Sequence, residues 1–108
     1  MTGPGAGEGR RSPDQSRDDQ ASLDSVRKRI LEVDELLVEL IGERRRLVLE
    51  IGALKARLGL PVLDPSREAA VVRRAAELAR ERRVDEELTR DVIWRIIASA
   101  REEQEKKG

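Results

Sequence analysis

Cysteine, histidine, tyrosine and phenylalanine are all absent from this sequence. Without cysteine the protein has neither a disulfide nor a thiol nucleophile. Without histidine it lacks an imidazole for acid–base catalysis and the usual ligand of zinc sites. Any chemistry that the chain performs must therefore rest on ionic groups and hydrogen bonds.

Aromatic side chains and unbalanced charge are also lacking. Aromatics make up 1% of the residues, and 22 basic side chains match 22 acidic ones. Nucleic-acid binding normally needs a basic surface or aromatic rings that stack on bases, so we expect no nucleic-acid partner. No apolar run is long enough to cross a membrane, and the N-terminus lacks the hydrophobic region of a secretory signal. We expect a cytoplasmic protein without membrane contact.

What the sequence does contain is charge and aliphatic side chains. Charged residues make up 41% of the 108, and a core built from Leu, Ile, Val and Ala favours long helices over a sheet. Residues 1–20 are rich in Gly, Pro, Ser and charged residues and nearly free of apolar ones. We expect them to form a disordered tail, with residues 21–108 as the single folded domain.

An apolar heptad pattern predicts one long helix from about Ser22 to Leu58, ended by Gly59 and Pro61. Its apolar positions alternate in spacing between three and four residues, and they are Leu23, Val26, Ile30, Val33, Leu37, Leu40, Leu47, Ile51, Leu54 and Leu58. These positions form one apolar stripe along the helix, the seam. Arg44 occupies one position of the seam, where the pattern requires an aliphatic residue.

Two shorter helices follow. Asp64 is a predicted N-cap with Pro65 at the first helical position, and this helix runs to about Arg82. Asp85 caps the last helix. The predicted apolar face of the helix that starts at Pro65 is Val71, Val72, Ala75, Leu78 and Ala79. That of the last helix is Leu88, Val92, Ile93, Ile96, Ile97 and Ala100.

The long helix would extend about 55 Å, which is more than a compact domain of this size is wide. The two shorter helices cannot cover its seam, so a second copy of the chain must do so. The expected fold class is all-α, with three helices per chain, one of them very long, in an intertwined homodimer.

Several polar residues lie where apolar ones are expected. Arg44 and Lys55 are eleven residues apart, about three turns, so they project from nearly the same face. Gln104 continues the apolar stripe of the last helix. Each has a structural alternative: an internal ion pair for the two cations, and a frayed helix end for Gln104. Burying a cation or an amide without a partner costs free energy, however, and an anionic ligand would supply the partners.

Arg67 and Glu68 open the second helix, where unpaired N–H groups and the helix dipole favour an anion. Their structural alternatives are a surface pair for Arg67 and a complement to the dipole for Glu68. Arg27 and Lys55 are about 42 Å apart along one helix, so one small ligand could contact both only in an antiparallel dimer with shared pockets.

These residues and their spacing resemble the all-helical class of chorismate mutase over nearly the whole of residues 22–104. The matching segments are Val26-Arg27 to Val33-Asp34, Glu43-Arg44-Arg45, Ile51 to Lys55, residues 61–68, and Ile96-Ile97 to Gln104. The family converts chorismate to prephenate, on the route to phenylalanine and tyrosine, by an intramolecular Claisen rearrangement that needs no cofactor and no metal.

The resemblance implies a role for each matching residue. Arg44 and the Arg27 of the other subunit would bind the two substrate carboxylates. Lys55 would contact a carboxylate and the ether oxygen, and Gln104 would donate to the ether oxygen. Glu68, assisted by the Asp64 backbone, would accept from the substrate hydroxyl, and Arg67 would add positive charge. Ala100 departs from the family, in which many members have a serine, so the affinity for substrate is expected to be lower.

Three alternatives remain open at this stage. Isochorismate pyruvate lyase uses the same scaffold, although its pattern generally lacks an acid at the position of Glu68. An aminodeoxychorismate mutase would not obviously select the Arg67-Glu68 pair. A non-enzymatic helical dimer would use Arg44 and Gln104 to fix its register. The sequence is compatible with activity alone or together with a partner enzyme of the shikimate pathway.

Overall fold

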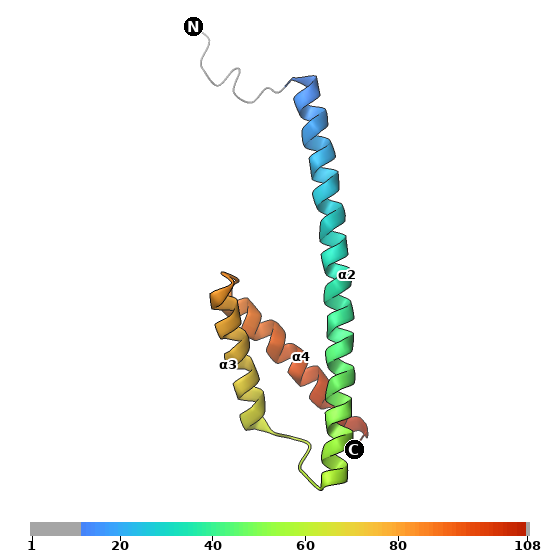
Figure 1. The fold of residues 1–108 in the computed structure, drawn as a ribbon, viewed down its shortest axis with the longest axis vertical. Coiled ribbons are helices and arrows are strands. Elements are labelled where there is room, and N and C mark those ends of the chain that lie inside the picture. Colours follow the sequence, from blue (N-terminus) through green and yellow to red (C-terminus); the bar gives the residue numbers. More distant parts are fainter. Residues whose placement is uncertain (1–11, 108) are drawn as a thin grey trace. The chain divides into compact units, whose positions relative to one another are not determined.

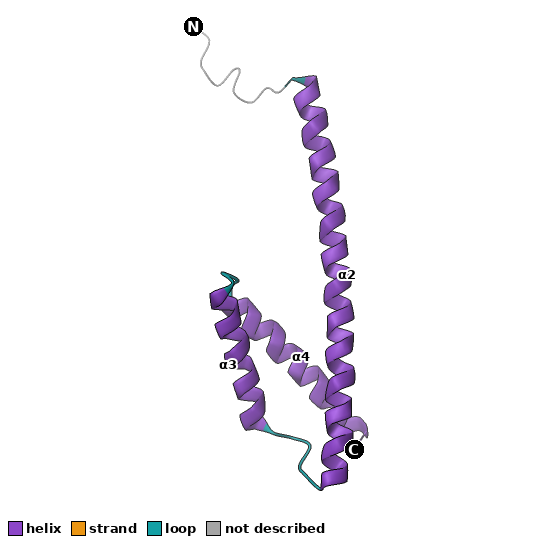
Figure 2. Ribbon diagram, viewed as in Figure 1, coloured by secondary structure: helices purple, strands orange, loops and turns teal. Residues whose placement is uncertain are grey.

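A computed structural model describes residues 12–107, and within this range the chain forms three α-helices and no strand (Figure 2). The helices are α2 (Pro13–Leu58), α3 (Pro65–Glu81) and α4 (Glu86–Lys107). The predicted all-α class, with one long and two shorter helices, is confirmed. None of the described helices is both long and apolar enough to cross a membrane.

Helix α2 begins earlier than the predicted start near Ser22. Ser12 precedes the helix and its Oγ accepts a hydrogen bond from the Gln15 N–H at 3.0 Å, with Pro13 at the first helical position. Side-chain bonds from Gln15 to Asp19 and from Gln20 to Asp24 then link successive turns. Residues 13–20 were expected to be disordered, but they are helical. Once a helix has formed, each added residue gains a backbone hydrogen bond, so the helix can extend without an apolar face. Residues 1–11 of the expected tail lie outside the described range.

The end of α2 agrees with the prediction. Gly59 has φ 71°, a left-handed conformation that glycine adopts without steric cost. The Leu60 N–H donates to the Lys55 carbonyl at 2.8 Å, and the Gly59 N–H donates to the Ala56 carbonyl at 3.2 Å. These two bonds form a Schellman motif, which turns the chain away from the helix axis toward α3.

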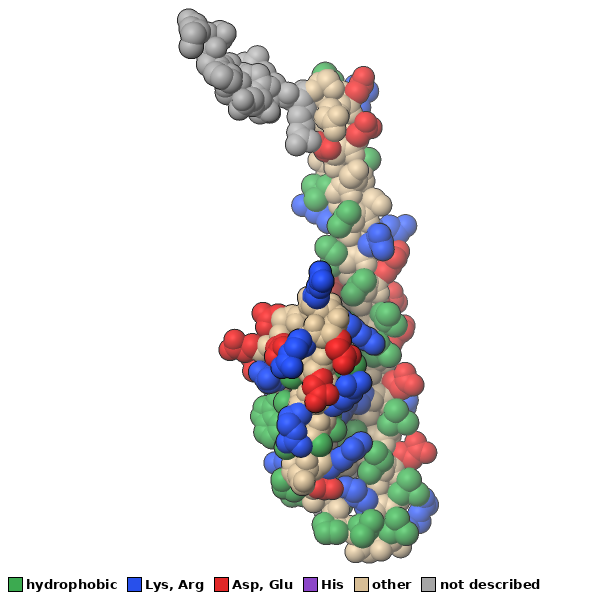
Figure 3. Space-filling view, turned by 60° about the vertical axis from the view of Figure 1, so that its left-hand side comes forward, with side chains coloured by type: hydrophobic (Ala, Val, Ile, Leu, Met, Phe, Trp, Pro, Cys, Tyr) green, Lys and Arg blue, Asp and Glu red, His purple; other side chains and the backbone are tan. Residues whose placement is uncertain are grey.

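The chain divides into two compact units, residues 1–39 and 40–108, with the boundary inside α2. In the first unit, the described residues form helix from Pro13 onward. Its large aliphatic side chains are exposed at the surface, as the space-filling view of Figure 3 illustrates along this helix. They are Leu23, Val26, Ile30, Leu31, Val33, Leu36, Leu37 and Val38, with exposed fractions from 44% to 69%.

In the second unit, α3 and α4 form an antiparallel hairpin (Figure 1). Its turn is a second Schellman motif, with Arg83 at φ 57° and the Val84 N–H donating to the Ala79 carbonyl at 2.8 Å. The buried core of the described chain is Ala76, Ala79, Ile97 and Ala100, each 3–7% exposed.

The predicted apolar faces include three of these four core residues. The fourth, Ala76, is buried in place of the predicted Ala75, which is only partly covered. A shift of one residue rotates a helix face by about 100°. The buried face of α3 is therefore centred away from Ala75, and it combines the predicted Ala79 with Ala76, which the sequence pattern did not include.

Candidate active site

A pocket of about 190 Å³ lies within the second unit. Its walls come from the C-terminal part of α2, the segment that joins α2 to α3, the start of α3 and the C-terminal half of α4. The lining residues are Arg44, Val48, Ile51, Lys55, Val62, Leu63, Asp64, Arg67, Glu68, Val71, Ile97, Ala100, Arg101 and Gln104. Every residue that the sequence nominated for the site is among them except Arg27.

Arg27 lies on α2 in the first unit, with an exposed side chain. All residues that line the pocket belong to residues 40–108. The pocket of a single chain thus contains the predicted cations Arg44, Lys55 and Arg67 and lacks the one that was assigned to the other subunit.

Helix periodicity brings Arg44 and Lys55 to the same wall of the pocket, as their spacing predicted. Both residues are partly buried. The Lys55 Nζ donates a hydrogen bond to the Val62 carbonyl at 3.2 Å. This bond ties the ammonium group to the segment between α2 and α3 and leaves it two further donors.

Asp64 has the capping role that the sequence predicted. Its Oδ1 accepts from the Arg67 N–H at 3.0 Å, and its carbonyl accepts from the Glu68 N–H at 3.0 Å. The cap satisfies one of the unpaired N–H groups at the start of α3 and holds Arg67 and Glu68 at the pocket wall.

Glu68 has a partner that the sequence analysis missed. Its carboxylate is bound by Arg101 of α4, whose Nε donates to Oε2 at 3.3 Å and whose Nη2 contacts Oε1. A signal was available, because Arg101 follows Ala100 and precedes Gln104 by three residues on the same helix. The apolar pattern does not single out Arg101, because its position lies just beside the apolar stripe, where solvent-exposed charged residues are usual.

Gln104 faces inward, as its position on the stripe predicted. Its Nε2 donates to the Val48 carbonyl of α2 at 3.3 Å. Gly52 lies beside it, and a Cβ at this glycine would stand only 3.2 Å from the same nitrogen. The absence of a side chain at Gly52 therefore lets the Gln104 amide approach α2 closely.

The charge of the pocket favours an anion. Four of the lining residues are cations and two are anions, so cations exceed anions by two. The described residues contain no group of three or more acidic side chains that could hold a metal ion. The wall presents an amide, an ammonium and guanidinium groups, which can bind carboxylates and stabilise negative charge that develops on an oxygen.

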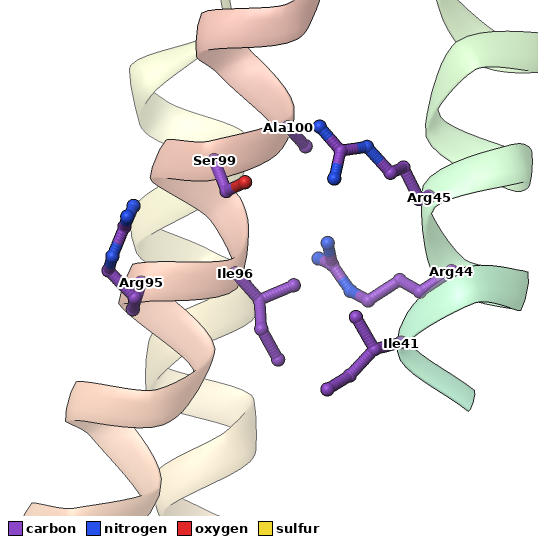
Figure 4. Close-up of a pocket in the computed structure, with 7 residues that line it drawn as sticks. All are labelled: Ile41, Arg44, Arg45, Arg95, Ile96, Ser99 and Ala100. Carbon is purple, nitrogen blue, oxygen red and sulfur yellow. The ribbon is translucent and has the colours of Figure 1, made fainter. Parts of the chain in front are cut away.

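A second cavity adjoins the first and shares Arg44 and Ala100 with it. In Figure 4, Arg44 and Arg45 project from α2 toward Ile96 and Ser99 of α4, whereas Arg95 points away from them. Ser99 lines this second cavity and not the first. It therefore does not replace, in the first pocket, the hydroxyl that Ala100 lacks.

Comparison with known proteins identifies the family. The model of chorismate mutase type II matches residues 26–105. A chorismate mutase from Methanocaldococcus jannaschii is 38% identical over 66 residues, covering 61% of this chain and 67% of that protein.

Two further relatives are much longer than this chain. A T-protein from Enterobacter agglomerans is 34% identical over 88 residues, covering 82% of this chain and 24% of that protein. A T-protein from Haemophilus influenzae is 30% identical over 76 residues, covering 70% of this chain and 20% of that protein. The chain thus spans about a quarter or less of the T-proteins that it matches. The family match covers every residue of the pocket, and the chain belongs to the chorismate mutase type II family.

Proposed function

We propose that this protein is a chorismate mutase, which rearranges chorismate to prephenate within one molecule of substrate. The observation that carries the proposal is the convergence of Arg44, Lys55, Arg67, Glu68 and Gln104 in a single pocket. These residues come from three helices, and they supply cations for carboxylates, an acceptor for a hydroxyl, and two donors for an oxygen.

The proposed reaction suits a site without a nucleophile. In a Claisen rearrangement one C–O bond breaks as one C–C bond forms, and no proton or electron is exchanged with the protein. Arg44 would hold a substrate carboxylate and keep the flexible side chain folded over the ring, which lowers the entropic barrier by several kcal/mol. Arg27 of a second subunit would hold the other carboxylate.

Lys55 and Gln104 would stabilise the transition state. As the C–O bond breaks, negative charge grows on the ether oxygen, and a donor aimed at such an oxygen is typically worth about 3–4 kcal/mol. In the free protein each of these groups donates to a backbone carbonyl. An ammonium has three donors and an amide has two, so each keeps a donor for the substrate.

We also propose that the protein is a homodimer with shared sites. The support is the exposed aliphatic seam of α2, because large apolar surfaces of this kind are normally covered by another chain. In the dimer, Arg27 of one subunit would complete the pocket of the other. We further propose that the protein acts in the cytoplasm, on the route to phenylalanine and tyrosine, alone or with a partner enzyme of the shikimate pathway.

The test is incubation of the purified protein with chorismate and, separately, with isochorismate. Loss of chorismate with formation of prephenate is expected, whereas release of pyruvate from isochorismate alone would replace the mutase by a lyase. Lys55→Ala should lower kcat/KM by about a hundredfold or more. The matched control is Arg57→Ala, which removes an exposed cation two residues away that does not line the pocket.

A further inference from the structure

Arg101 is a cation of the pocket to which the proposed mechanism gives no task. It lies on α4, and its side chain is 33% exposed, against 17% for Glu68 on α3. Two nitrogens of its guanidinium group bind the two oxygens of the Glu68 carboxylate. Such two-point pairing defines the orientation of a carboxylate as well as its position.

This pairing removes the remaining freedom of Glu68. Its backbone is already held in the first turn of α3, where its N–H donates to the Asp64 carbonyl at 3.0 Å. The side chain would otherwise sample several rotamers at the pocket wall. A carboxylate oxygen has two acceptor sites, so Glu68 can bind Arg101 and still accept a hydrogen bond from a ligand hydroxyl.

Arg101 also changes the charge that a ligand meets. A dianionic substrate is repelled by the Glu68 carboxylate, and a guanidinium group at contact distance offsets this repulsion. Without Arg101, the excess of cations over anions in the pocket falls from two to one.

We infer that Arg101 is a positioning residue that acts through Glu68. It holds the carboxylate where the substrate hydroxyl donates to it, and it offsets the charge of that carboxylate against the carboxylates of the substrate. The inference rests on the proposed mutase function.

A double-mutant cycle tests the inference, with chorismate as the substrate of the full-length protein. Arg101→Gln should lower kcat/KM by about tenfold to a hundredfold, the range expected for a charge-assisted hydrogen bond that loses its partner. Most of the loss should appear in KM, because the hydroxyl contact exists in both the ground state and the transition state. In the Glu68→Gln background, the same change should cost less than about threefold.

Two further variants separate positioning from structural support. Arg101→Lys keeps the charge without the two-point geometry, so an intermediate loss is expected, and this variant serves in the same cycle if Arg101→Gln fails to fold. Arg90→Gln removes another Arg–Glu ion pair of α4, 3.6 Å from Glu86 and outside the pocket, and should leave kcat/KM unchanged.

Three results would overturn the inference. Equal losses in both backgrounds would mean that Arg101 contacts the substrate directly. Wild-type kinetics in folded Arg101→Gln would mean that the ion pair only supports the fold, and in folded Arg101→Lys that the two-point positioning of the Glu68 carboxylate has no effect. Absence of mutase activity in the wild-type protein would remove the proposed function and this inference together, whereas the first two results leave the mutase intact.

Discussion

At the scale of single residues, the choice of an amide at position 104 has a direct chemical consequence. Gln104 donates to the Val48 carbonyl in the free protein, and in the proposed mechanism it donates to the ether oxygen. A carboxylate at this position can only accept hydrogen bonds, whereas a protonated carboxyl group can donate one.

Gln104→Glu should therefore make the reaction dependent on acid. We expect kcat/KM to fall by about a hundredfold or more at neutral pH and to rise as the pH falls toward the range in which carboxyl groups are protonated. The measurement is kcat/KM against pH for the variant and the wild type, with folding checked at each pH. Parallel profiles would mean that Gln104 does not face the breaking bond.

A substitution of Gly52 should lower the activity of the protein without lowering its stability. Gly52→Ala gains helix propensity of about 1 kcal/mol, but the new Cβ would lie 3.2 Å from the Gln104 Nε2 and must displace it. We expect a Tm that is not lower and a kcat about tenfold lower, because small displacements of a catalytic group are costly.

Gly42→Ala is the matched control for Gly52→Ala. Its Cβ would meet only the Arg46 Nη1, at an ordinary contact distance of 3.9 Å. This variant should gain the same helix propensity and keep the wild-type kcat. Equal kcat values in the two variants would show that the position of the Gln104 amide does not limit the reaction.

At the scale of the helices, an ion pair joins the end of α3 to the start of α4 across their turn. The Arg80 Nε donates to the Glu86 Oε1 at 2.6 Å, and its Nη2 donates to Oε2 at 3.4 Å. Hydrogen bonding from Arg80, together with the charges of Arg80 and Arg90, holds the pKa of Glu86 below its usual range. Burial has a smaller, opposite effect on this pKa.

A lowered pKa makes the contribution of Glu86 to stability dependent on pH. The pair stabilises the folded state above the ordinary titration range of glutamate, and the stabilisation disappears as the pH falls through the lowered pKa of Glu86. The Tm of Glu86→Gln should therefore lie below that of the wild type at neutral pH, and the two values should converge in acid.

The control for this prediction is Glu87→Gln, in the same first turn of α4. It changes the interaction with the helix dipole without removing the pair to Arg80. Its Tm should differ little from that of the wild type over the whole range. A difference between Glu86→Gln and wild type that stays constant down to strongly acidic pH would contradict the assignment.

The first turns of α2 offer another prediction at the scale of the helices. Residues 13–20 are helical but include no aliphatic side chain. We propose residues 21–108 as the catalytic domain. Deletion of residues 1–20 should change the free energy of unfolding by no more than about 0.5 kcal/mol and leave kcat/KM unchanged.

The contrasting variant lacks residues 1–30 and so loses Leu23, Val26, Arg27 and Ile30. It should lose most of its activity, because a cation and part of the apolar seam are removed. Circular dichroism, thermal unfolding and the chorismate assay compare the two truncations. A large loss in the shorter truncation would show that the first turns of α2 belong to the domain.

At the scale of the whole molecule, the shared-site dimer makes a complementation prediction. Arg27→Ala and Lys55→Ala homodimers should each be nearly inactive, since every pocket lacks a cation. A heterodimer has one pocket with both cations intact. Refolding the two variants together should restore roughly a quarter of the wild-type rate if the subunits mix at random.

The complementation experiment needs each variant refolded alone as its control, and a mass measurement to show that dimers form. If dimers form but the mixture stays as inactive as its components, Arg27 does not serve the pocket of the other subunit. A monomeric wild-type protein with full activity would contradict the dimer itself.

Much of the fold and of the candidate site could be predicted from the sequence, because the patterns that predict them are local. Heptad spacing predicted α2, Gly59 predicted its end, and Asp64 and Pro65 predicted the start of α3; each depends on residues within one or two turns. The helical spacing of Arg44 and Lys55 put them on one wall for the same reason.

Only the tertiary structure decided which of these groups meet. Arg101 and Glu68 are 33 residues apart in the chain, and Gln104 and Val48 are 56 apart. Their contacts depend on how α4 packs against α3 and α2, which is set by the burial of Ala76, Ile97 and their neighbours and by the open backbone at Gly52. Helix periodicity determines the face on which a residue lies, but the packing of all three helices determines what that face contacts.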